Sequence, residues 1–126
     1  MDRPADDVPT LSPATLALRL GLEIGAFTGL GVGGWSVGRW IGVVVAPLVG
    51  IVLWGTFNVP DDPSRSGRAP VPVAGPVRLA GELAGRAAGF AGWALGGLWP
   101  VTVVLGALAA LHYATSTARV RWLLRS

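Results

Sequence analysis

Five ionisable residues lie within or beside long apolar stretches of this chain of 126 residues: Arg19, Glu23, Glu82, Arg86 and His112. Ionisable residues in such segments are energetically costly, and by default they mark a proton relay, an ion path or a substrate anchor. Arg19 precedes Glu23 by four residues and Glu82 precedes Arg86 by four, so the two segments carry their charges in opposite order. These residues predict a polar network inside an apolar domain.

The same residues argue against a catalytic, metal or cofactor site. A nucleophile, its base and an orienting group are missing as a set, because the single histidine would have to serve every role. One histidine with two carboxylates beside arginines is a weak metal site, and the chain has no cysteine. Residues 29–34 match G-x-G-x-x-G, but no strand precedes them and no acidic residue occurs from 35 to 60. We therefore expect no enzyme activity and no cofactor.

The composition predicts that the apolar segments lie in a lipid bilayer. Hydrophobic residues make up 52% of the chain and charged residues only 13%, which is about half the usual share in a soluble domain. The net charge of +3 does not indicate a nucleic-acid partner, because the basic residues are scattered between apolar runs and form no basic face. The expected partner is the lipid bilayer.

Four apolar stretches are long enough to be helices that cross about 30 Å of hydrocarbon. They cover residues 13–34, 40–58, 76–96 and 99–116. Proline occupies the expected first helical position at Pro13, Pro76 and Pro100, and Pro60 ends the second helix. The prediction is an all-α, integral membrane four-helix bundle.

The remaining segments are polar and are expected in water. They are a disordered N-terminal tail at 1–12, a loop at 59–75 and a basic C-terminal tail at 117–126, which leaves 13–116 as the transmembrane domain. The acidic N-terminus lacks the basic start of a signal peptide, so we expect it to be retained.

Arginine and tryptophan set the expected orientation. Placing both termini and the loop inside gives six inner arginines against Arg39 alone outside, as the positive-inside rule requires. The inner arginines are Arg3, Arg65, Arg68, Arg119, Arg121 and Arg125. The tryptophans fall near helix ends and none falls at an expected midplane. We therefore expect a multi-pass protein of the plasma membrane with a cytoplasmic N-terminus and C-terminus.

An internal repeat predicts two helical hairpins of the same orientation. Arg19-Leu20-x-x-Glu23 returns 59 residues later as Arg78-Leu79-x-x-Glu82. Each unit has two crossings, so the copies form a parallel repeat about an axis along the membrane normal. Small residues at every fourth position favour close helix packing within one bundle, and they also permit a homodimer or a contact with another membrane protein.

Equal depth predicts which charges meet. At about 1.5 Å per residue from the helix starts, Arg19 and Glu82 lie about 9 Å deep, whereas Glu23 and Arg86 lie about 15 Å deep. Side by side, the first and third helices would pair Arg19 with Glu82 and Glu23 with Arg86. The competing geometry pairs Arg19 with Glu23 and Glu82 with Arg86 within one helix. Arg78, close to the inner surface, is expected to snorkel without a partner.

The segment from residue 54 to 85 resembles the YrdB-like family, small bacterial membrane proteins built around a domain of unknown function. The resemblance rests on an aromatic-bounded helix end, a proline-containing loop and an Arg-Leu-x-x-Glu-Leu helix start, with a similar Arg-Leu-x-x-Glu near the N-terminus. Here these are Trp54, Gly55, Phe57 and Pro60, then Arg78, Leu79, Glu82 and Leu83, and earlier Arg19, Leu20 and Glu23. The resemblance implies a four-helix integral membrane protein and no particular activity.

Two functions remain open from the sequence. The first is a non-enzymatic scaffold or accessory protein in which Arg-Glu pairs fix the first helix to the third. The alternative is a small transporter or proton-coupled permease that uses Glu23, Glu82 and His112, because a histidine can titrate near neutral pH and gate an inward-facing pocket.

Overall fold

The computed structural model describes residues 8–64 and 69–126. Within these ranges the chain is helical, apart from two strands of two residues that pair in parallel. The elements are α1 (Pro13–Thr56), β1 (Phe57–Asn58), β2 (Val71–Pro72), α2 (Gly75–Leu95), α3 (Trp99–Ala114) and α4 (Thr117–Leu124). The expected all-α class is confirmed, while Arg3, Arg65 and Arg68 lie outside the described residues.

Helix α1 folds back on itself and supplies two of the four expected helices. The side chain of Ser12 accepts a hydrogen bond from the backbone N–H of Thr15 at 3.2 Å and caps its start. At Arg39 the backbone leaves helical geometry, with φ 53° and ψ −130°, and the chain reverses. This turn separates a first arm, residues 13–38, from a second arm, residues 40–56.

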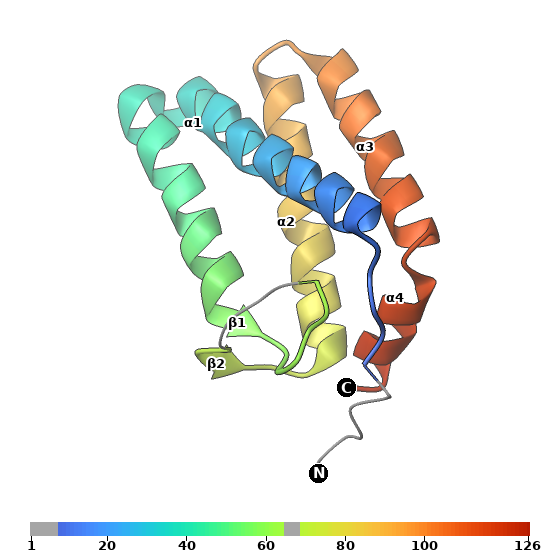
Figure 1. Cartoon of the computed structure of the whole chain (residues 1–126). Coiled ribbons are helices and arrows are strands. Elements are labelled where there is room, and N and C mark those ends of the chain that lie inside the picture. The colour runs from blue at the N-terminus through green and yellow to red at the C-terminus, as the bar shows by residue number, and fades with distance from the viewer. Residues whose placement is uncertain (1–7, 65–68) are drawn as a thin grey trace.

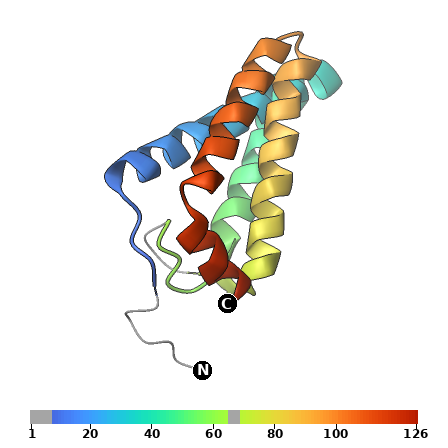
Figure 2. The same ribbon diagram turned by 90° about the vertical axis from the view of Figure 1, so that its right-hand side faces the viewer.

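The second arm, α2 and α3 run lengthwise through the molecule, whereas the first arm leans across α2 and α3 (Figures 1 and 2). The first arm and α2 run in the same general direction, and the second arm and α3 run back (Figure 1). The two hairpins are therefore packed differently, because only the first has an oblique arm. The start of the described chain, at Val8, and the C-terminus lie at the same end of the molecule as β1 and β2.

Glycine lets the helices touch backbone to backbone near the turns. A Cβ atom placed on Gly29 would overlap the carbonyl group of Gly89, and one placed on Gly33 would meet Gly92. No side chain larger than hydrogen fits between the first arm and α2 at this height. Close approach of this kind gives dispersion contacts between helices without any polar group.

A small apolar core joins the loop after β1 to α4, at the end of the molecule opposite the turns. Val59, Trp122 and Leu123 are buried together, and Val8, Val73 and Leu79 pack against them. We expected residues 117–126 to be a tail in water, and the structure instead contains α4, whose Arg119 is fully buried. The loop expected in water likewise buries Val59 and Asp62.

Hydrophobic and charged residues are distributed in the reverse of the usual pattern. Only six hydrophobic residues of the described chain are buried, whereas most of the large apolar side chains of the second arm are exposed. The buried polar residues are Arg19, Asn58, Asp62, Arg78, Glu82, Arg86, His112, Ser116 and Arg119. Charged residues in soluble proteins are seldom buried in this number.

By length and composition, α1 is the one described helix that is apolar enough to cross a membrane. Its most apolar stretch has a mean hydropathy of 1.9, and none of that stretch is buried inside the protein. Helices α3 and α4 together meet the same criterion as a single span bent by 73°.

Candidate functional site

Five segments of the described chain contribute side chains to one buried ionic cluster. We use "the ionic cluster" for Arg19, Asp62, Arg78, Glu82, Arg86, Tyr113 and Arg119. Helix α2 supplies three of them at four-residue spacing, which places them on one helix face. The first arm, the loop after β1, α3 and α4 supply the rest. Residues that are far apart in the sequence thus meet around a single helix.

The carboxylate of Glu82 is the centre of the ionic cluster. It is fully buried and accepts hydrogen bonds from Arg19 at 2.9 Å and from Arg119 at 2.6 and 3.1 Å. The Nε of Arg78 donates to it at 3.2 Å and the hydroxyl of Tyr113 at 3.0 Å. Charge-assisted bonds of this type are the strongest in proteins, and here they occupy both carboxylate oxygens. The predicted pair between Arg19 and Glu82 is therefore present.

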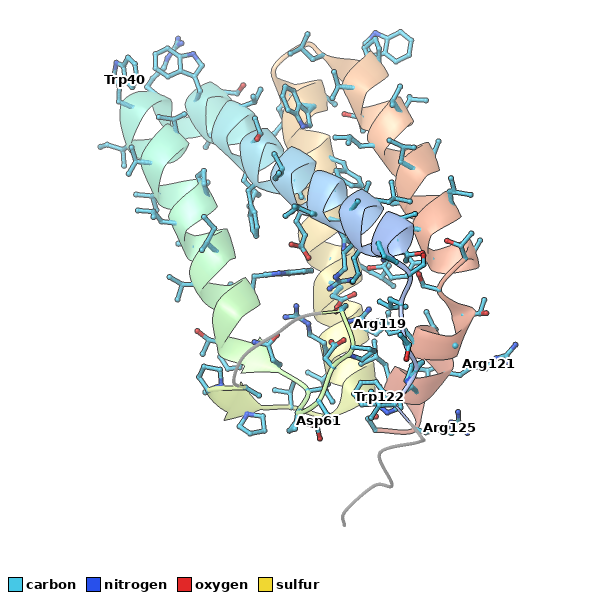
Figure 3. The ribbon with its side chains drawn as sticks, in the orientation of Figure 1. Trp40, Asp61, Arg119, Arg121, Trp122 and Arg125 are labelled. Carbon is cyan, nitrogen blue, oxygen red and sulfur yellow. The ribbon has the colours of Figure 1, made fainter. Side chains whose placement is uncertain are left out.

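Arg119 links Glu82 to a second buried carboxylate. Its Nη2 and Nε donate to the two oxygens of Asp62 at 2.6 and 2.8 Å. In Figure 3 Arg119 points inward from α4, whereas Arg121 and Arg125 point away from the protein. Burial alone would raise the pKa of Asp62, but the hydrogen bonds and charge of Arg119 outweigh it and hold that pKa below its ordinary value. Burial would lower the pKa of Arg119, and its two carboxylate partners raise it instead.

Arg78 does not snorkel to the surface as expected. It is buried, and its Nη1 donates to the backbone carbonyls of Trp54 and Phe57 at 3.1 and 2.8 Å. Its guanidinium carbon also lies 4.1 Å from the centre of the Trp54 ring. Arg78 therefore ties the end of the second arm to α2, because the last carbonyls of a helix have no partner within the helix.

The predicted pair between Glu23 and Arg86 is absent from the ion pairs of the described residues. Glu23 pairs instead with Arg19 on its own helix, at 3.2 Å, and its side chain keeps 20% exposure. The Nε of Arg86 donates to the hydroxyl of Tyr113 at 3.0 Å. The cause is the rotation of the first arm about its own axis. Leu22 and Ala26 form the face that packs against α2, so Glu23 on the neighbouring face does not pair with Arg86.

His112 lies in α3 beside the ionic cluster and is fully buried. Its ring contacts that of Tyr113 edge to face, with centroids 4.9 Å apart. Within the described ranges neither ring nitrogen has a hydrogen-bond partner. The structure thus brings all five predicted residues into one neighbourhood, but it joins His112 to the rest only through ring contact.

The chemistry available to the ionic cluster is electrostatic. Among residues 8–64 and 69–126, no group of three or more histidine, cysteine or acidic residues is arranged to hold a metal ion. Glu82 has all its accepting positions filled by fixed donors, so it is held in place as an ion. A carboxylate in this state organises the helices around it.

Sequence reasoning missed Asp62, Tyr113 and Arg119. Arg119 carried a usable signal, because Arg119, Trp122 and Leu123 follow i, i+3, i+4 spacing and indicate a helix with one buried face. Asp62 carried none, since Asp61 beside it is exposed and identical in type. Only the folded loop distinguishes the two aspartates.

A family model described as "Protein of unknown function (DUF2568)" matches residues 17–120, a range that contains the whole ionic cluster. The chain belongs to this family. The chain is also similar to the uncharacterized protein YrdB of Bacillus subtilis (strain 168). The two are 38% identical over 118 residues, which covers 90% of this chain and 96% of YrdB. No solved structure matches the chain.

Membership of DUF2568 confirms the resemblance found from residues 54–85 and from the two Arg-Leu-x-x-Glu segments. Neither the name of the family nor that of YrdB includes an activity.

Proposed function

We propose that this protein is a non-enzymatic, multi-pass protein of the bacterial plasma membrane that scaffolds or assists a partner. Its four crossings would be the two arms of α1, α2 and α3. The observation that carries the proposal is the reversed distribution of side chains, with apolar residues outside and a buried ionic cluster centred on Glu82 inside. Lipid is the solvent that favours this arrangement, because it takes up apolar surface and excludes unpaired ions.

The length of the helices supports this reading. The first arm and α2 are each longer than 20 residues, which exceeds the number needed to span about 30 Å of hydrocarbon. Helix α3 has 16 residues, a rise of about 24 Å. Short spans are accommodated by local thinning of the bilayer.

The orientation follows from where the charges lie. Trp40 lies at one end of the molecule, and Asp61, Arg121 and Arg125 lie toward the other (Figure 3). An even number of crossings puts both termini on one side, in keeping with the packing of Val8 against α4 near the C-terminus. The positive-inside rule favours the cytoplasm for that side.

The ionic cluster would serve as the structural joint of such a protein. α2 alone carries Arg78, Glu82 and Arg86, and a charge near the bilayer centre costs about 2.5–3.5 kcal/mol. Arg19 and Arg119 share the carboxylate of Glu82, so the first arm, α2 and α4 neutralise one another. The charges of α2 are therefore neutralised in lipid only when the first arm and α4 are packed against it.

Single-cysteine labelling tests the topology cleanly, because the chain has no cysteine of its own. Val37→Cys and Leu98→Cys at the two turns should react with a membrane-impermeant maleimide in intact bacteria. Thr10→Cys and Ser126→Cys should react only after permeabilisation. Recovery of the protein in the soluble fraction, or labelling of the termini in intact cells, would reject the proposal.

A proton-coupled permease is the rival function, and one observation favours it. Glu23 is the carboxylate near the ionic cluster that keeps solvent access, and it lines a cavity. Glu82 is too fully bonded to exchange protons readily, so a permease would depend on Glu23 with His112 nearby. A pH-driven flux in liposomes that Glu23→Gln abolishes, while thermal stability is unchanged, would establish the rival.

A further inference from the structure

A cavity of about 510 Å³ lies between the two arms of α1 and α2, beside the ionic cluster. Its walls are mostly apolar and include Phe27, Leu30, Leu53 and Val77 (the helices at the left and centre of Figure 3). Three charged residues also line it: Glu23, Arg78 and Arg86. The volume falls in the usual range of small-molecule sites, and a few polar groups in an apolar wall are their usual chemistry.

Arg86 lines this cavity, and two of its hydrogen-bond donors, themselves closed off from solvent, are unused. It is 97% buried, with only 3% exposure, yet neither Nη1 nor Nη2 has a hydrogen-bond partner among the described residues. Its guanidinium carbon stands 5.5 Å from the ring of Trp54, which is another wall of the cavity. Buried guanidinium donors are nearly always bonded, so an acceptor is missing here.

The charges of the ionic cluster and Glu23 also indicate that one negative charge is missing. Four guanidinium groups, of Arg19, Arg78, Arg86 and Arg119, face the carboxylates of Glu23, Asp62 and Glu82, so four against three leaves one positive charge. Each carboxylate already has an arginine partner other than Arg86. His112, the remaining titratable base nearby, adds no negative charge.

We propose that this cavity binds an amphiphile with an anionic headgroup, which pairs with Arg86 while its alkyl chain lies along the apolar wall. A carboxylate and a phosphate share the chemistry required, since both present two oxygens to the fork of a guanidinium. The proposal rests on the membrane location proposed above, because the ligand enters from the bilayer.

The test titrates purified full-length protein in neutral detergent with palmitate, and with hexadecanol as a chain of equal length without charge. Palmitate should raise the melting temperature by several degrees, and hexadecanol should leave it unchanged. Two further arms, phosphatidylglycerol in neutral nanodiscs and inorganic phosphate, separate a lipid headgroup from a free anion. A shift with phosphate alone, equal shifts with palmitate and hexadecanol, or no shift with either palmitate or phosphatidylglycerol would overturn the proposal.

Two variants make the result specific to the cavity. Arg86→Gln should reduce the affinity for the active amphiphile at least tenfold while raising the melting temperature of the ligand-free protein, because it removes an unpaired charge. Gly85→Leu fills the cavity where a Cβ meets open space, and it should abolish binding with Arg86 intact. Arg39→Gln at the turn is the matched control and should bind as wild type.

Unaltered binding in both Arg86→Gln and Gly85→Leu would place the ligand elsewhere and reject the site. A ligand-free Arg86→Gln protein less stable than wild type would show that Arg86 already has a counter-charge. The labelling of the turns and termini is independent of these results, so failure of the ligand site leaves the proposed topology standing.

Discussion

The two ends of the molecule hold the same helices together by different physics. Near the turns, the first arm meets α2 through Gly29, Gly33, Gly89 and Gly92, with backbone against backbone and no charge. Near the termini, the same two helices meet through Arg19 and Glu82, with Arg119 of α4 as a further partner. The distance between helix axes is set at the first end and the choice of neighbour at the second. Dispersion contacts form with any small surface that fits, whereas a buried ion is stabilised only by a group of opposite charge.

The largest expected effect comes from removing the charge at the centre of the ionic cluster. Glu82→Gln keeps the shape of the side chain but leaves three arginines without their shared carboxylate. We expect a loss of about 3–5 kcal/mol in the free energy of unfolding, the usual cost of breaking a buried ion pair on one side. Membrane-fraction abundance and detergent melting would measure it, and a variant as stable as wild type would contradict this view of the ionic cluster.

A comparable test at the turn end uses two glycines of the same helix. Gly89→Leu places a side chain against the backbone of Ala26 and should cost about 1–3 kcal/mol or more through overpacking. Gly81→Ala, whose Cβ meets nothing within 4 Å, is the matched control and should change stability by less than about 1 kcal/mol. Equal melting temperatures for the two variants would show that the glycine contact does not fix the helix spacing.

The pH dependence of stability sharpens the comparison, because only the polar end has a titrating carboxylate outside the helices. The folded protein holds the pKa of Asp62 below its unfolded value, so this stabilisation is present above pH about 4 and lost as the pH falls through the lower folded pKa. Asp62→Asn should lose about 1–3 kcal/mol at neutral pH and lose less on acidification than wild type does. Parallel melting curves against pH for the two proteins would contradict the role of Asp62.

The smallest effect is expected for the carboxylate that remains accessible. Glu23→Gln removes a partly exposed pair with Arg19 and should cost less than about 1 kcal/mol. Arg19 keeps Glu82 as its partner in this variant. A loss as large as that of Glu82→Gln would show that Glu23 compensates a buried charge, and would restore the predicted pair with Arg86.

Much of this arrangement could be predicted from residue order alone. Proline positions and apolar run lengths located the helices, with α2 at Gly75–Leu95 and α3 at Trp99–Ala114 against the expected 76–96 and 99–116. Depth along a helix also predicted that Arg19 meets Glu82. These features depend on local sequence or on one coordinate, the distance from a helix start.

The other contacts depend on how each helix is tilted and rotated about its own axis. Positions counted along the sequence do not determine these angles. Glu23 and Arg86 are at equal expected depth, but the face of the first arm that packs against α2 carries Leu22 and Ala26 instead of Glu23. Arg78 is the fourth residue of α2, and Trp54 and the end of the second arm close over it. Asp62 reaches Arg119 only because the loop folds under α4.

The ionic cluster also dictates an order of assembly during synthesis. Arg19 and Arg78 leave the ribosome before or with Glu82, but Arg119 follows it by 37 residues. Until then Glu82 lacks its shortest bonds and Asp62 has no arginine. A chain that ends before α4 therefore lacks the arginine that joins the two buried carboxylates of Asp62 and Glu82, and its ionic cluster is incomplete.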